Sequence, residues 1–133
     1  MIETYTFIKT DQNVTSFARV QVEFIPRNNQ HGIKICEAII EPVNREAGEF
    51  APNERTSWFS AALNAMKVVA DKAATIGVDG ELRLRKLIGS ITDTSDDAVS
   101  CAAGLAAFRL LIPTHPMPVV SEKRPWELIW PNE

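Results

Sequence analysis

The sequence predicts an α+β protein in which two helices pack on one face of a four-stranded sheet. Three kinds of pattern support this fold class. Several segments alternate apolar and polar residues with the period of a strand, one segment carries apolar residues at helical spacing, and a run of small residues follows a polar cap. In chain order the elements read β-β-β-α-β-α, and a proline-rich tail follows them.

The length and composition favour one globular domain. The 133 residues suffice for a single core, and the apolar fraction of 45% is ordinary. No apolar run reaches the ~18 residues that cross a bilayer, and the first residues do not resemble a secretory signal. We therefore expect a cytoplasmic protein without membrane contact, with one domain over residues 1–112 and an extended tail over residues 113–133, docked on that domain or on a partner.

The charge and the cysteines exclude some simple functions. A net charge of −3 does not favour nonspecific binding to nucleic acid, although a local basic face is compatible with it. Cys36 and Cys101 lie in apolar surroundings without CxxC spacing. They are expected to be buried reduced thiols and not part of a disulfide framework or a zinc site.

The N-terminal third predicts three strands. Residues 4–8 alternate weakly, and a turn follows at residues 10–13. Residues 16–25 have a strict period of two, which places one apolar row inward: Ala18, Val20, Val22 and Phe24. Residues 28–32 are typical of a hairpin connection, so residues 33–40 are expected to return beside that strand.

The first helix and the next strand follow from their periodicity. Asn53 is a plausible N-cap, Gly77 is expected to end the helix, and the apolar stripe comprises Phe59, Ala62, Leu63, Met66, Val69, Ala70 and Ala73. After Gly80 the alternation predicts a strand. Its inward side chains are expected to be Leu82, Leu84 and Ile88, and its outward ones Arg83, Arg85 and Leu87.

The second helix begins after a polar cap. Thr94 and Asp97 have the spacing of a capping box, and three acidic residues suit the positive end of a helix: Asp93, Asp96 and Asp97. The small-residue run from 98 to 111 favours very close packing, and Pro113 ends the helix. In the tail, Trp126, Leu128 and Trp130 alternate with other residues, which indicates a docked segment.

Candidate catalytic chemistry is sparse. His31 and His115 lie in predicted loops, and no Ser or Cys nucleophile is marked by a local motif. The aspartates around position 95 lack a calcium-loop pattern, and no phosphate-binding glycine loop occurs. We predict no catalytic residues, no metal site and no cofactor. An enzyme with a pocket near Asp93 and His31 ranks last among the hypotheses, because acid, base and nucleophile are not visibly combined.

Basic residues are expected to gather on the sheet face away from the helices. They are Arg19, Lys34, Arg83, Arg85 and Lys86. Such a row can meet the phosphates of a folded RNA, whereas the simpler interpretation is an ordinary solvated face.

Several collinear motifs resemble a known family. Residues 93–99, which read DTSDDAV and lead into an Ala-rich helix, resemble the Asp-Ser-Ser-Glu-x-Ala-Phe motif of domain IV of translation elongation factor G. Residues 10–26 are similar to that domain's tip loop and following strand. Residues 50–54 resemble the stretch before its first helix, and residues 82–87 the strand before the acidic motif. The resemblance covers residues 4–111 or so.

This resemblance implies the fold called ribosomal protein S5 domain 2-like, with a left-handed β-α-β crossover. In the family the domain reaches the decoding region of the small ribosomal subunit with two tip loops. Here residues 11–14 read DQNV in place of a glycine-rich tip, and residues 89–92 form a shortened second loop without the family's histidine.

Two binding hypotheses remain. The first is a noncatalytic binding module for the ribosome or RNA, and its expected contact residues are Gln12, Asn13, Thr15, Arg19, Arg83, Arg85, Ser90 and Thr92. The second is a protein-interaction domain that forms a homo-oligomer, in which Trp126, Leu128 and Trp130 cover the sheet or a sheet edge of a neighbour.

Overall fold

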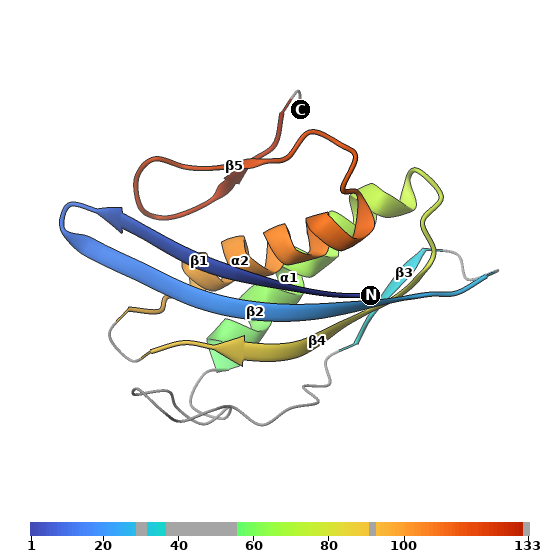
Figure 1. Cartoon of the computed structure of the whole chain (residues 1–133), viewed down its shortest axis with the longest axis horizontal. Helices are drawn as coiled ribbons and strands as arrows, with labels where there is room; N and C mark the ends of the chain where they lie inside the picture. The colour runs from blue at the N-terminus through green and yellow to red at the C-terminus, as the bar shows by residue number, and fades with distance from the viewer. Residues whose placement is uncertain (29–31, 37–55, 91–92, 132–133) are drawn as a thin grey trace.

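Four strands form one mixed sheet with the order β1-β2-β4-β3 in the computed structural model, which describes residues 1–28, 32–36, 56–90 and 93–131. The strands are β1 (Ile2–Asp11), β2 (Val14–Pro26), β3 (Ile33–Cys36) and β4 (Gly80–Ile88). Helices α1 (Thr56–Ala74) and α2 (Asp96–Leu111) both lie on one face of this sheet, as Figure 1 shows. The predicted two-layer α+β architecture and its β-β-β-α-β-α order are therefore confirmed.

β1 and β2 form a long hairpin that is joined by a tight turn. The register runs without interruption from Ile2 opposite Glu23 to Asp11 opposite Val14. Gln12 and Asn13 connect the strands with φ of 50° and 65°. A two-residue turn with positive φ at both positions matches the right-handed twist of the flanking strands. Both strands extend beyond the predicted residues 4–8 and 16–25.

The predicted hairpin between β2 and residues 33–40 is wrong. β3 pairs in parallel with β4 at the far edge of the sheet, while β4 lies antiparallel beside β2. The chain passes from β3 through α1 to β4, so these elements form a parallel β-α-β unit. The alternation of a strand shows which side chains face inward but not which strand lies beside it. Residues 37–40 and most of the expected connection lie outside the described residues.

One irregularity in β4 overturns the predicted orientation of Leu87 and Ile88. Val22 lies opposite Leu84, but its neighbour Gln21 lies opposite Lys86, so Arg85 is an extra residue in β4. This bulge shifts the alternation by one position, because two residues of one strand oppose one of the other. Leu87 is consequently buried with 1% exposure, whereas Ile88 is only half-buried.

The core lies between the sheet and the two helices. α2 covers β1 and β2, and α1 lies beside α2 and over β3 and β4. α2 is enclosed on almost every side, because Ala98, Val99 and all residues from Cys101 to Phe108 are buried. Small side chains permit this close approach to three neighbours at once. The expectation of two buried thiols is correct for Cys101, whereas Cys36 is half-buried; both are free.

The N-terminal end of α2 differs from the predicted cap, whereas the C-terminal end of α1 agrees with it. Ser95, not Thr94, is the N-cap of α2. The Thr94 hydroxyl instead donates to the Phe17 carbonyl at 2.6 Å, so it fastens the preceding loop to β2 and cannot cap the helix. Gly77 ends α1 as predicted: its φ is 87°, and the amides of Gly77 and Val78 donate to the carbonyls of Ala74 and Ala73, which is the Schellman pattern after a helix. The predicted N-cap Asn53 lies outside the described residues. In α1, Trp58 is buried, whereas the predicted core residues Phe59 and Leu63 are only half-buried.

The tail folds back onto the sheet edge and α2. Its two short strands, β5 (Val119–Val120) and β6 (Leu128–Ile129), pair antiparallel near β1 and α2 (Figure 1). Trp126 is 3% exposed and packs edge to face on Phe7 with ring centroids 5.8 Å apart. Its backbone amide donates to Asp97 Oδ2 at 2.7 Å, so the acidic start of α2 anchors the tail. None of the described helices is both long and apolar enough to span a membrane.

Candidate nucleic-acid interface

The sheet face opposite the helices carries a concentration of positive charge. Among the described residues of the strands, alternation and register place five cationic side chains there, against the carboxylates of Glu23 and Glu81, for a net charge of +3: Arg19, Lys34, Arg83, Arg85 and Lys86. The whole chain has a net charge of −3, so this face is opposite in sign to the protein as a whole. We call this surface, together with the threonines of β1 and Phe17 and Gln21 of β2, the open face.

The two carboxylates are already engaged with arginines. Arg83 donates to Glu81 at 3.0 Å, and Arg85 donates to Glu23 at 3.3 Å. The hydrogen bond that Arg83 donates to Glu81 raises the pKa of the Arg83 guanidinium, and the negative charge of Glu81 raises it further. Pairs at this level of exposure contribute little to folding stability, because water solvates the separated ions nearly as well. Their main effect is to hold both arginines in fixed positions on the sheet.

Arg19 differs from these paired arginines. Its Nε donates to the Thr6 hydroxyl at 3.0 Å, and its guanidinium lies 5.7 Å from the centre of the Phe17 ring. The exposed side chain has no acidic partner among the described residues. A guanidinium has five N–H donors, so most of those of Arg19 remain available to a phosphate.

Neutral polar side chains share the rest of the open face along β1 and β2 with the exposed Ile2 and Ile8. Gln21 donates to the Thr4 hydroxyl at 3.0 Å, and the hydroxyls of Thr10 and Thr15 lie 2.9 Å apart. Such a hydroxyl and amide surface can hydrogen-bond to phosphate and sugar oxygens without reading a base sequence.

Two loops lie at the same end of the sheet as Arg19. The exposed Gln12 and Asn13 form the β1–β2 turn. The loop after β4 is fastened to β2, because the Asp93 carbonyl accepts the amide of Phe17 at 2.8 Å. Within this loop the hydroxyl of half-buried Ser90 accepts the amide of Asp93 at 3.1 Å, so it supports the loop. The other predicted loop contact, Thr92, lies outside the described residues.

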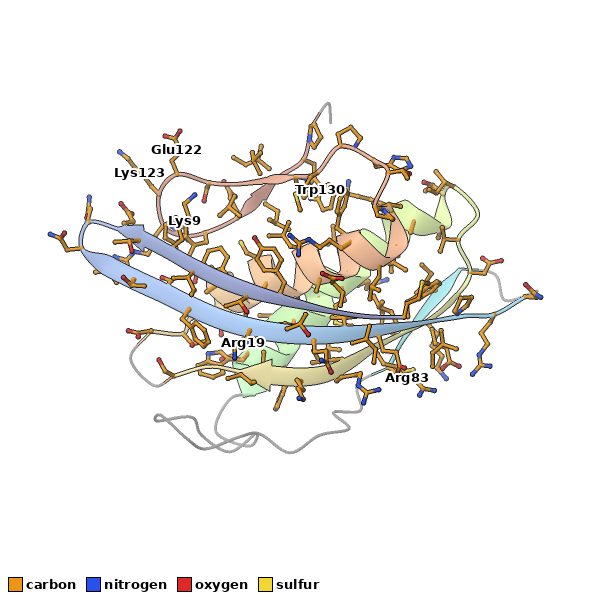
Figure 2. All side chains as sticks on the ribbon, viewed as in Figure 1. Lys9, Arg19, Arg83, Glu122, Lys123 and Trp130 are labelled. Carbon is orange, nitrogen blue, oxygen red and sulfur yellow. The ribbon has the colours of Figure 1, made fainter. Side chains whose placement is uncertain are left out.

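The predicted contact residues therefore divide into two groups. Arg19 lies opposite Ile88, at the end that carries the loops, whereas Arg83 lies opposite Glu23. Arg19 and Glu23 are four residue steps apart along β2, which corresponds to about 13 Å. Figure 2 shows Arg19 and Arg83 at separate points along the strands. This spread suits contacts with several successive phosphates and not with one small anion.

A feature that the sequence did not reveal is a cavity under the tail. It has a volume of about 380 Å³ and lies between α1, α2 and the tail, where Ala65, Cys101, Leu128 and Trp130 contribute to its walls. Burial raises the pKa of the Cys101 thiol to about 12, so this thiol is protonated at neutral pH. Across the helix surface, Trp130 lies under the ammonium group of Lys72, 4.6 Å from its ring centre. The tryptophan spacing predicted docking but not the helices that receive it.

The other residues considered for catalysis do not converge with this cavity. His115 is exposed in the tail and lines a second hollow of about 390 Å³ beside α1 and Trp130. Asp93 is exposed at the opposite end of α2 from His115, and His31 lies outside the described residues. Among the described residues, no three His, Cys, Asp or Glu side chains are placed to share a metal ion.

Comparison with known proteins gives a likeness of fold. No protein-family model matches this sequence, and no functionally curated protein matches it. A crystal structure of a protein from Thermus thermophilus is similar over 87% of this chain, with a TM-score of 0.58 and 17% sequence identity. This chain spans 16% of that protein's length. The arrangement of two helices on a four-stranded sheet is thus a fold that recurs within a much larger solved protein.

Proposed function

We propose that this protein is a noncatalytic module that binds folded RNA through the open face of its sheet. The observation that carries the proposal is the net charge of +3 on this face in a chain of net charge −3. Nonspecific attraction between a protein and nucleic acid depends mainly on neutralised phosphates, so charge segregation of this kind favours one face over all others.

Arg19 is the centre of the proposed interface. Its charge, which has no acidic partner in the described part of the chain, lies beside the half-buried ring of Phe17 and opposite Ile88, where β4 ends. An arginine next to an aromatic ring can contact a phosphate while the ring stacks on an unpaired base. Arg83 and Arg85 extend the contact along the sheet, where their carboxylate partners hold them in place.

The proposed target is the ribosome, and the proposed location is the cytoplasm. The support is the collinear resemblance to domain IV of elongation factor G together with the observed β-β-β-α-β-α order. In that family the tip loops reach into the small subunit. The corresponding turn of this chain lies at the Arg19 end of the open face, so loop and face can engage one RNA surface together.

The test measures binding to purified small ribosomal subunits by sedimentation at about 50 and about 200 mM salt. We expect the unmodified protein to bind at low salt and to release with rising salt. Arg19→Glu is expected to weaken binding at least about tenfold, since it removes one phosphate contact and adds repulsion. Lys123→Glu, which makes the same change in charge on the exposed tail loop, is the matched control (Figure 2).

Two results would contradict the proposal. One is the absence of binding at low salt to both the subunits and their isolated RNA. The other is equal loss of binding in Arg19→Glu and Lys123→Glu, because this would show that only the net charge matters. Circular dichroism establishes that both variants are folded, which the exposure of both side chains leads us to expect.

The alternative of self-association through the tail has less support. Trp126 is buried against Phe7, and Leu128 packs over Gly104, where a Cβ atom would lie 2.6 Å from its Cδ1. These side chains are engaged within their own chain and are not available to a neighbour in this arrangement.

A further inference from the structure

The outer edge of β1 exposes a regular row of backbone groups. Met1 and Phe24 exchange reciprocal backbone hydrogen bonds of 2.9 and 3.3 Å, which fixes the pattern of the β1–β2 ladder. In an antiparallel ladder such pairs recur at every second residue, so the odd-numbered residues of β1 bond to β2. The even-numbered residues then direct their amide and carbonyl groups in the plane of the sheet and away from β2: Ile2, Thr4, Thr6, Ile8 and Thr10.

This edge is long, and the tail lies beside it without pairing to its backbone in the described structure. None of those five residues has a backbone hydrogen-bond partner among the described residues. The tail approaches β1 through the side chains of Lys9 and Asp11, which donate to Ser121 and accept from Arg124, respectively. Ile8 and Ile2 are 65% and 49% exposed beside the free edge. A strand edge of this length without a proline can act as a template for another strand.

We propose that the occupant of this edge is a second copy of the same chain, with two β1 strands paired antiparallel about a twofold axis at Thr6. In this register Glu3 lies opposite the partner's Lys9, and the partner's Glu3 lies opposite Lys9. Both pairs lie on the helix side of the sheet, and opposite charges directly across a ladder stabilise it. Tyr5 lies opposite the partner's Phe7 on the same side.

The present contacts of these residues are compatible with the pairing. The ammonium group of Lys9 donates to the Ser121 carbonyl at 2.8 Å and lies 5.3 Å from the centre of the Trp126 ring, which leaves two of its N–H donors for another acceptor. Glu3 accepts one bond from Arg109 at 3.2 Å and has lone pairs to accept another. On the opposite side, Ile8 would pack beside the partner's Thr4, which covers an exposed apolar side chain.

The register gives the pairing its specificity. A shift by one residue would place Glu3 and Lys9 on opposite faces from their partners, and a shift by two would leave the charges out of line. The twofold axis is perpendicular to the sheet, so the two open faces lie on the same side of one eight-stranded sheet. Pairing of the two β1 edges does not require RNA on the open face.

The experiment measures the mass of the full chain by sedimentation equilibrium over a range of concentrations. We expect a monomer–dimer equilibrium for the unmodified protein. Thr6→Pro is expected to weaken the dimer at least about tenfold, because it removes the central outward amide of a strand edge that tolerates proline. Thr6→Ala, which keeps that amide, is the matched control and is expected to dimerise normally.

A charge-swap pair tests the register directly. Glu3→Lys alone places lysine opposite lysine, and Lys9→Glu alone places glutamate opposite glutamate, so each variant is expected to be monomeric. An equimolar mixture restores both opposite-charge pairs and is expected to form the mixed dimer. A monomer at every concentration of the unmodified protein would overturn the proposal, as would a dimer that Thr6→Pro leaves intact. Failure of the two folded variants to associate on mixing would overturn the register.

Discussion

The two faces of β2 carry alternate residues of one strand, yet they differ in almost every physical respect. On the helix side, Ala18, Val20 and Val22 are completely buried. On the open side, Arg19 and Gln21 hydrogen-bond to threonine hydroxyls of β1. The helix side is a close-packed apolar layer, whereas the open side is a polar lattice held by side-chain hydrogen bonds.

This difference separates stability from recognition. Burial of apolar area is the main favourable term in folding, whereas exposed ion pairs contribute little. Residues one position apart along a strand should therefore affect different properties. A substitution that faces the helices changes the free energy of unfolding, and one that faces outward changes the affinity for a polyanion.

The largest expected effect comes from a neighbouring pair on β4. Leu84→Ala is expected to lower the free energy of unfolding by about 3 kcal/mol, because it leaves a cavity in a fully buried layer. Arg83→Ala is expected to change it by less than about 1 kcal/mol, since its ion pair with Glu81 is partly exposed. Urea denaturation measures both values. Equal destabilisation by the two substitutions would remove the proposed separation of the faces.

A smaller effect is expected at the start of α2, where the tail closes the helix side. Asp97→Ala is expected to cost about 1 to 3 kcal/mol, because the Trp126 and Ala98 amides lose their carboxylate acceptor. Asp96→Ala is the matched control, since Asp96 is an exposed acid in the same helical turn.

Limited proteolysis provides a second readout of the same pair. The tail of Asp97→Ala is expected to be cut faster than that of Asp96→Ala, because its anchor to α2 is lost. If both variants were cut at the same rate as the unmodified protein, the bond to the Trp126 amide would not be what holds the tail.

The smallest effect at neutral pH concerns Cys101, which lies on the helix side. Its pKa is raised to about 12 by burial, so the folded state retains a proton that the unfolded state releases near the ordinary value. The contribution of this thiol to the free energy of unfolding is fully present below the pKa of Cys101 in the unfolded chain. It is lost as the pH rises toward about 12. Between about pH 9 and 11, unfolding free energy should fall more steeply than in Cys101→Ala, by up to about 1.4 kcal/mol per pH unit.

The rate at which iodoacetamide alkylates the native protein tests the burial of Cys101 independently of any unfolding measurement. Cys36 is half-buried and is expected to react before Cys101, whose sulfur is both buried and protonated. Faster reaction at Cys101 would mean that the cavity under the tail admits the reagent and that the thiol is not desolvated.

Local patterns predicted most of the elements but not all of their surroundings. The alternation of β2 identified its buried row, because a strand with one dry side must place every second residue inward. Strict alternation failed at Leu87, because Arg85 is an extra residue opposite β2. The two consecutive basic residues Arg85 and Lys86 are the only local sign of this bulge in β4. Thr94 has the spacing of a helix cap, but its hydroxyl donates to the carbonyl of Phe17 in β2 instead.

The candidate site shows the same division. The period of a strand, which is a local property, was enough to predict that Arg19, Arg83 and Arg85 face away from the helices. Lys86 faces the same side because of the bulge at Arg85. The folded arrangement was needed to place β4 between β2 and β3 and to pair Glu23 and Glu81 with two of the arginines. It was also needed to leave Arg19 beside the loops without an acidic partner in the described part of the chain. Strand order and the pair between Glu23 and Arg85 join residues far apart in the chain, and the free energy of those contacts exists only once the chain has folded.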